Sequence, residues 1–185
     1  MKWSAAALFA LAITPASAFD AFPFNIGGDY ALTDQHGEAR TQADPDGHFQ
    51  LLFFGYANCE QICSAAFPMM GDIVADIAAV ETVVPVMITV DPETDTVEYL
   101  DTLTQYHENF VGLTGTEEEL QVAYDAFSVE KELLFVDPAG QPVYSHGSFI
   151  YLLDGNGKVL TLVPPIMDVD QAVALITPYV AGQEG

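Results

Sequence analysis

The chain has 185 residues and a formal net charge of −23 at pH 7, because 27 acidic side chains face only four lysines and arginines. This balance argues against nucleic acid as a partner, since phosphate binding needs a basic face, and it favours cations and basic protein surfaces. Half of the residues are hydrophobic, which excludes a disordered chain and is enough for one domain with a sizeable core.

The first residues have the features of an export signal. Lys2 precedes the apolar stretch 5–13, and Ala16-Ser17-Ala18 has the small-x-small pattern of a cleavage site. The apolar stretch is far shorter than the roughly 20 residues of a membrane-spanning helix. We therefore predict a cleavable signal peptide over residues 1–18 and a single domain over residues 19–185, soluble in the periplasm after cleavage.

Strands and helices are expected to alternate along the rest of the chain. Alternating apolar residues around the turn 34–37 predict a hairpin over 29–41, and the continuous apolar run 49–56 predicts a strand buried on both faces. Further strands are expected at 84–90, 110–115, 148–153 and 158–163. Helices are expected at 59–77, 96–107, 116–127 and 168–180, with N-terminal capping residues at Asn58, Asp95 with Glu98, Thr116 with Glu119, and Asp168 with Gln171.

This order predicts an α/β fold in which a mixed central sheet lies between helices. Its thioredoxin-like version is an α/β/α sandwich, here with an N-terminal β-hairpin, and redox residues then lie where the first core strand meets its helix. In this chain that junction is Tyr56 to Cys63. It contains both cysteines, Cys59 and Cys63, which are the only two in the sequence.

Two cysteines one helical turn apart can perform two kinds of chemistry. Cys59 would lie in the first turn of a helix, where the helix dipole favours the thiolate, and Cys63 would lie on the same helical face. The pair can cycle between dithiol and disulfide, or its thiolates can share a soft metal ion such as copper(I) or zinc. A purely structural disulfide would close a loop of about five residues and contribute only about 2 kcal/mol.

A third ligand would have to be a histidine. Zinc usually requires two further Cys or His ligands at familiar spacings, whereas copper(I) accepts fewer. Among the four histidines we select His146, because its loop could reach the end of the sheet that carries Cys59; a hydrogen-bonded loop histidine is the alternative. His36 and His48 are expected in solvated turns, and His107 at the end of a helix.

The sequence as a whole resembles the Sco/SenC family of thioredoxin-fold copper proteins. The resemblance runs from about Gly27 to Val180 and includes GGDYALTDQHGEA, FFGYANCEQIC, VPVMITVDPETDT, FVGLTGTEEEL and HGSFIYLLDGNGKVL. Cys59 and Cys63 match the family's Cys-x-x-x-Cys, and His146 matches its distant histidine. The family often has proline after each cysteine, aspartate between them and aspartate before the histidine; here those positions hold Glu60, Ser64, Gln61 and Ser145.

The resemblance implies a copper chaperone. Copper, as Cu(I) or also Cu(II), would be bound by Cys59, Cys63 and His146. The partners would be cytochrome c oxidase subunit II, whose dinuclear copper-A centre such proteins help to assemble, or another copper-accepting protein, and an upstream periplasmic copper donor; the chain itself would be a monomer. The family also contains proteins regarded as thiol reductants of the target's cysteines.

Three other functions stay open at this point. In a thiol–disulfide oxidoreductase, Cys59 would attack a target disulfide and Cys63 would resolve the mixed disulfide. A peroxiredoxin-like peroxidase commonly needs a nearby arginine, and the only one is Arg40, expected in a turn. The chain could also be a structural or regulatory copper-binding module. The acidic segment with Asp91, Glu93 and Asp95 is interpreted as a turn and a helix cap rather than a metal site.

Overall fold

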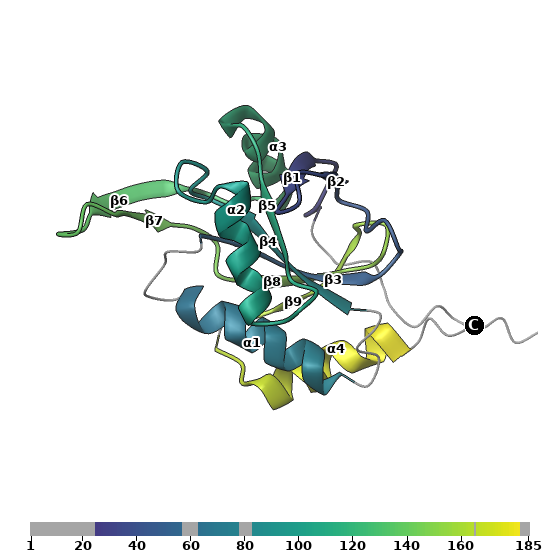
Figure 1. Ribbon diagram of the computed structural model, residues 1–185. Coiled ribbons are helices and arrows are strands. Elements are labelled where there is room, and N and C mark those ends of the chain that lie inside the picture. Colours follow the sequence, from purple (N-terminus) through teal and green to yellow (C-terminus); the bar gives the residue numbers. More distant parts are fainter. Residues whose placement is uncertain (1–24, 57–62, 78–82, 165, 182–185) are drawn as a thin grey trace, which may run out of the picture.

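The computed structural model describes residues 25–56, 63–77, 83–164 and 166–181. Its centre is a mixed seven-stranded sheet (Figure 1). In order across the sheet, the strands are β2 (Ala39–Thr41), β1 (Ala31–Asp34), β5 (Val111–Thr114), β4 (Val83–Thr89), β3 (Phe49–Gly55), β8 (Ile150–Leu153) and β9 (Val159–Val163). The described part of the chain therefore has the expected α/β architecture with an N-terminal hairpin, β1–β2, paired antiparallel.

Strand β3 lies inside the sheet, between β4 and β8, as its continuous apolar sequence predicts. Every residue of β3 is buried. It pairs in parallel with β4, Phe53 opposite Met87, and antiparallel with β8, Leu51 opposite Leu152. A strand with neighbours on both sides and covered on both faces needs apolar side chains in both directions, which explains the absence of polar alternation.

Helices cover both faces of β3. The ring of Phe53 packs on Phe67 of α1 (Cys63–Asp76), whereas Phe54 packs on Tyr124 and Phe127 of α3 (Glu117–Phe127). The last helix, α4 (Val169–Ala181), lies beside α1 (Figure 1). Two of the capping pairs are confirmed: Thr116 and Glu119 form a reciprocal capping box, and the Asp168 carboxylate accepts from the Gln171 N–H while the Gln171 side chain accepts from the Asp168 N–H.

One face of α1 is apolar and packs in the core. Phe67, Met70 and Val74 are buried in the core, and Ile77, just beyond the helix, is buried too. Gly71 permits a close approach, since a Cβ at this position would collide with the backbone carbonyl of Tyr106. The predicted start of the helix at Cys59 and its cap at Asn58 lie outside the described residues.

The expected helix over 96–107 is wrong in two respects. Thr96, not Asp95, is the N-cap, because its side chain accepts from the Tyr99 N–H. The helix is α-helical only in α2 (Val97–Leu100) and continues as the 3-10 helix η2 (Asp101–Gln105). Asp95 is instead fully buried and accepts a hydrogen bond from the Thr89 hydroxyl.

The expected strands 148–153 and 158–163 form the antiparallel pair β8–β9, but a further hairpin was not expected from the sequence. Strands β6 (Glu132–Val136) and β7 (Pro142–Ser145) pair antiparallel and form a separate two-stranded sheet. The pair projects from the body of the molecule (Figure 1). All five residues of β6 are exposed, so the strand lacks the buried–exposed alternation by which strands are recognised. Among the described residues, no helix is long and apolar enough to span a membrane.

Candidate metal centre

His146 lies directly after β7, in the loop that leads to β8. Its half-buried imidazole meets the end of β3 edge to face. Ring centroids are 5.7 Å apart for Phe53 and 5.9 Å for Tyr56, with interplanar angles of 82° and 83°. The loop carrying His146 therefore reaches the carboxyl end of β3, the edge from which the chain continues toward the cysteines.

The backbone around His146 fixes the tautomer of the ring. Nδ1 lies 3.0 Å from the carbonyl oxygen of Gly147. A carbonyl can only accept a hydrogen bond, so this contact requires a proton on Nδ1 and places the lone pair of the neutral imidazole on Nε2. A metal-binding histidine characteristically donates its other ring N–H to an acceptor of this kind. Ser145 stands where the family often has aspartate, and the Gly147 carbonyl orients the ring here.

Tyr144 connects this ring cluster to the rest of the fold. Its ring packs on Tyr56 at 5.7 Å and 88°. Burial raises the pKa of the Tyr144 hydroxyl above its usual value, and the charges of Asp91 and Glu93 and a hydrogen bond with Asp91 raise it further. The hydroxyl therefore stays protonated at neutral pH beside the buried Asp91 carboxylate. The ring contact with Tyr56 joins Tyr144 to the end of β3.

The two cysteines are only partly within the described structure. Cys63 is the first described residue of α1, but its side chain is not among the described features. Cys59 lies outside the described residues. Convergence of Cys59, Cys63 and His146 on one ion therefore stays a prediction, supported by the position of His146 at the end of the strand that precedes the pair.

The acidic segment after β4 forms a turn, as interpreted from the sequence. The backbone carbonyl of Asp91 accepts from the N–H groups of Thr94 and Asp95. The buried carboxylate of Asp95 accepts from the Thr89 hydroxyl, whose oxygen accepts in turn from the Asp91 N–H. These contacts give the segment a structural role.

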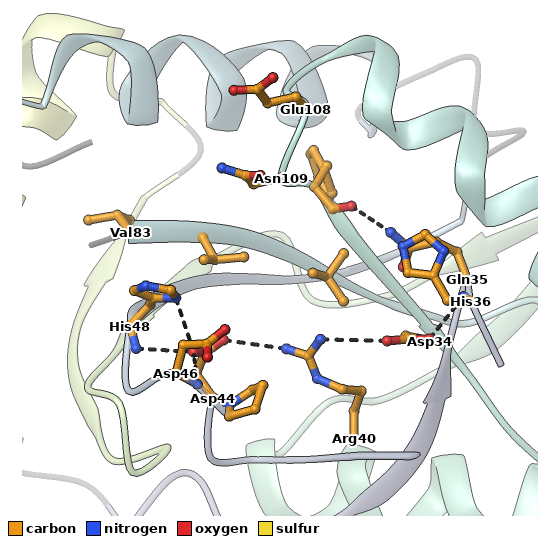
Figure 2. Close-up of a pocket in the computed structure, with 14 residues that line it drawn as sticks. Asp34, Gln35, His36, Arg40, Asp44, Asp46, His48, Val83, Glu108 and Asn109 are labelled. Carbon is orange, nitrogen blue, oxygen red and sulfur yellow. Dashed lines mark hydrogen bonds and ion pairs between the residues drawn. The ribbon is translucent and has the colours of Figure 1, made fainter. Parts of the chain in front are cut away.

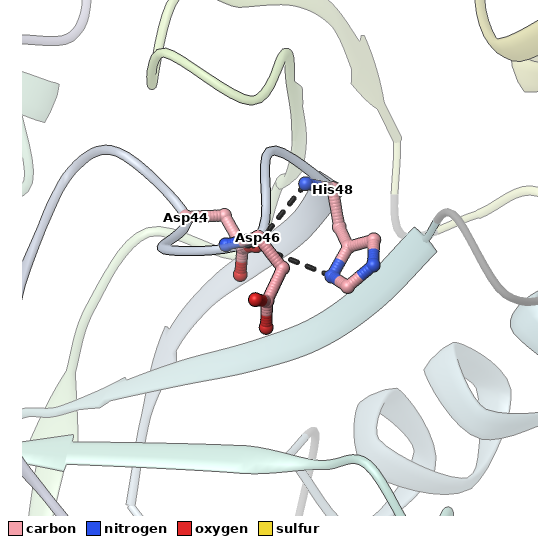
Figure 3. Close-up of side chains that lie close together, drawn as sticks. All are labelled: Asp44, Asp46 and His48. Atoms are coloured by element: carbon pink, nitrogen blue, oxygen red, sulfur yellow. Dashed lines mark hydrogen bonds and ion pairs between the residues drawn. The ribbon is translucent and has the colours of Figure 1, made fainter.

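The other three histidines have different surroundings. His36 is exposed, as expected, whereas the Nδ1 of His107 accepts from the Asn109 N–H. His48, expected in a solvated turn, is instead half-buried, with its Nδ1 3.2 Å from the Asp44 carboxylate. This contact belongs to a cluster of Asp44, Asp46 and His48 whose ligand atoms lie within 4.8 Å of one another (Figure 3).

The Asp44 cluster has a structural explanation. One oxygen of Asp44 accepts from the N–H groups of Asp46 and His48, which closes the turn before β3. Its other oxygen pairs with Arg40 at 3.4 Å, and Arg40 also pairs with Asp34 at 3.5 Å. Figure 2 shows Arg40 between these two carboxylates. It lines an open hollow of about 290 Å³.

Arg40 lies on β2 rather than in the expected turn. Its guanidinium is held by two carboxylates that are almost completely buried. The only arginine of the chain is thus engaged in holding the turn before β3, and this arrangement gives no support to a peroxiredoxin-like site.

Fold and site together define a thioredoxin-like protein in which an imidazole is held against the carboxyl end of strand β3. The family model SCO1/SenC matches residues 20–181, and the chain belongs to this family. An SCO2-like protein from Rickettsia felis is 37% identical over 139 residues, which cover 73% of this chain and 67% of the relative.

Solved structures show the same fold. Yeast Sco1 with copper bound superimposes with a TM-score of 0.75 and 27% identity, covering 85% of this chain and 89% of that one. BsSco, described as a member of the Sco family of cytochrome c oxidase assembly proteins, has a TM-score of 0.63 at 22% identity, covering 88% and 98%. The thioredoxin-like α/β class expected from the sequence is therefore confirmed.

Proposed function

We propose that this chain is a copper(I) chaperone that acts in cytochrome c oxidase assembly. The observation that carries the proposal is the position of His146. Its imidazole is held against Phe53 and Tyr56 at the end of β3, with the Nδ1 proton directed to Gly147. A histidine so restrained, at the junction that leads into a Cys-x-x-x-Cys pair, suits a soft ion bound by two thiolates and one imidazole nitrogen.

The bound ion is the cargo of the protein. Thiolates of Cys59 and Cys63 and the Nε2 of His146 would form a three-coordinate site, which leaves copper(I) open to an incoming ligand. Thiolates of the acceptor would then replace these ligands one at a time. Oxidation of the pair to a disulfide removes both thiolates and should abolish tight binding.

The acceptor that fits this chemistry is the copper-A domain of cytochrome c oxidase subunit II. The signal-like sequence of residues 1–18 supports export and action in the periplasm as a soluble protein. Intact-mass analysis of the exported protein tests this location. A soluble chain beginning at Phe19 supports it, and a membrane-bound chain that retains Lys2 contradicts it.

A thiol–disulfide oxidoreductase is the second candidate. Its support is the place of the cysteine pair in the chain, between β3 and the described part of α1, where thioredoxin-like enzymes place their cysteine pair. In that function Cys59 would attack a disulfide of the target, Cys63 would resolve the mixed disulfide and release the target's thiols, and His146 would not be needed as a ligand.

Anaerobic titration of the reduced mature protein with copper(I), against a chelator of known affinity, tests the proposal. We expect one tightly bound ion per chain, and its loss in Cys59→Ser and Cys63→Ser, because a hydroxyl is a hard and poorly ionised donor. Copper binding that survives both substitutions would place the ion elsewhere and refute the proposed site.

A further inference from the structure

The hairpin β6–β7 exposes a continuous group of large apolar side chains. Leu133, Leu134, Phe135 and Val136 are 53%, 55%, 51% and 57% exposed. Single apolar residues on a surface are ordinary, but four consecutive ones on one strand form a patch of the kind that marks an interaction site.

The hairpin also has little stability of its own when nothing covers it. Two strands alone are marginally stable in water, and β6 is exposed on both of its faces. A register irregularity lies between Leu133 and Phe135, so β6 is not a smooth edge for pairing with another strand. Contact between side chains, rather than addition of a strand, is the interaction this patch favours.

The hairpin leads directly to the candidate metal centre. Strand β7 ends at Ser145, directly before His146. Val143 of this strand therefore lies three residues, or about 10 Å of strand, from His146. Leu133 pairs with Tyr144 across the hairpin, and Tyr144 packs on Tyr56, which contacts His146. A protein that rests on the hairpin is therefore placed next to the imidazole.

The charged residues around the apolar patch indicate which kind of partner binds it. The exposed carboxylates of Glu130 and Glu132 flank the start of β6, and Asp137 follows its end. Lys131, the base beside the patch, is paired with Glu117 at 3.2 Å and lies over the rings of Tyr124 and Tyr144.

The patch is thus apolar with an acidic border. A second copy of this chain, which has a net charge of −23, and an anionic membrane would both be repelled. A protein surface with an apolar centre bordered by lysine and arginine is complementary to it.

We propose that the β6–β7 hairpin is the docking element for the protein that receives copper from the His146 site, and that this protein presents an apolar patch with a basic border. The proposal rests on the copper chaperone function proposed above. It assigns separate tasks to neighbouring parts of the chain: the ligands hold the ion, and the hairpin selects and orients the acceptor.

The test compares two recipients of copper(I). Transfer to a small chelator needs only the metal site, whereas transfer to the soluble copper-A domain of subunit II also needs docking. The variants are Leu134→Ser with Phe135→Ser, and separately Glu132→Lys. The matched control is Ile166→Ser, which alters a residue that is 92% exposed outside the hairpin. Thermal unfolding checks that every variant remains folded.

We expect both hairpin variants to transfer copper to the domain at least about tenfold more slowly, with wild-type rates to the chelator and in the control. Added salt should slow wild-type transfer to the domain only, because it screens the charged border.

Wild-type rates to the domain in both hairpin variants would overturn docking while leaving the chaperone function intact. Equal slowing toward the chelator would also overturn it, since the hairpin would then shape the metal site. A wild-type protein that fails to bind copper(I), or to transfer it to the domain, would refute the chaperone function itself, and the docking proposal with it. Wild-type dimerisation that the hairpin variants abolish, or wild-type flotation with anionic vesicles, would assign the hairpin to another occupant.

Discussion

The imidazole of His146 and the ring of Tyr56 meet edge to face, with centroids 5.9 Å apart and an interplanar angle of 83°. Phe53 makes a second contact of the same kind at 5.7 Å. Such contacts favour one ring orientation and contribute about 0.5–1.5 kcal/mol each beyond the area they bury. They hold a loop histidine in place before any metal ion arrives.

Replacement of Tyr56 tests this preorganisation. Tyr56→Leu removes the ring but keeps an apolar side chain, and should weaken copper(I) binding about five- to tenfold, which corresponds to about 1–1.4 kcal/mol. Tyr56→Phe keeps the ring and should bind within about twofold of wild type. Competition titration measures both, and equal affinity in Tyr56→Leu and wild type would show that the ring does not position His146.

Two buried tyrosines should respond oppositely to loss of the hydroxyl. The Tyr30 hydroxyl is buried and has no hydrogen-bond partner within the described part of the chain, whereas that of Tyr124 donates to the Thr89 carbonyl at 2.7 Å. Tyr30→Phe should raise the free energy of unfolding by about 1 kcal/mol, and Tyr124→Phe should lower it by about 1 kcal/mol. Urea unfolding that shows the same sign for both would contradict this assignment.

The same two residues predict a loss of stability in alkali. Burial raises the pKa of Tyr30 and of Tyr124 far above the ordinary value of 10.0. Above that value the unfolded chain loses protons that the folded chain retains, so the free energy of unfolding falls as pH rises. Urea unfolding between pH 9 and pH 11.5 should show this fall, and it should be smaller in Tyr30→Phe. A constant stability over this range would be the opposite result.

Arg40 should be important for stability although it lies at the edge of the sheet. Arg40→Ala leaves the nearly buried carboxylates of Asp34 and Asp44 without their cation, and should cost about 3 kcal/mol. Lys158→Ala, which alters an exposed lysine, serves as the control and should change the free energy of unfolding by less than about 0.5 kcal/mol. Equal effects in thermal or urea unfolding would mean that the Arg40 pairs contribute nothing.

Features that depend on residues close together in the chain could be predicted from the sequence. Capping residues such as Thr116 with Glu119 act within one turn, and the apolar run of β3 reports burial on both faces, so both were recognisable. The strand β6 was missed because its side chains do not alternate between core and solvent, although a turn sequence, Asp-Pro-Ala-Gly, follows it.

The surroundings of His146 depend on long-range contacts. Its loop was selected from the sequence as one that could reach the end of the sheet with Cys59, but its contacts with Phe53 and Tyr56 join residues some 90 positions apart in the chain. No periodicity or spacing encodes such neighbours.

The most direct test of the account is His146→Ala, measured for both copper(I) affinity and the rate of reduction of a model disulfide. The variant keeps both thiolates, so we expect copper affinity to fall at least about tenfold, or roughly 1.4 kcal/mol, while disulfide reduction stays near the wild-type rate. If the variant binds copper(I) as tightly as wild type and its disulfide reduction collapses, His146 serves thiol chemistry, and the oxidoreductase function replaces the copper chaperone.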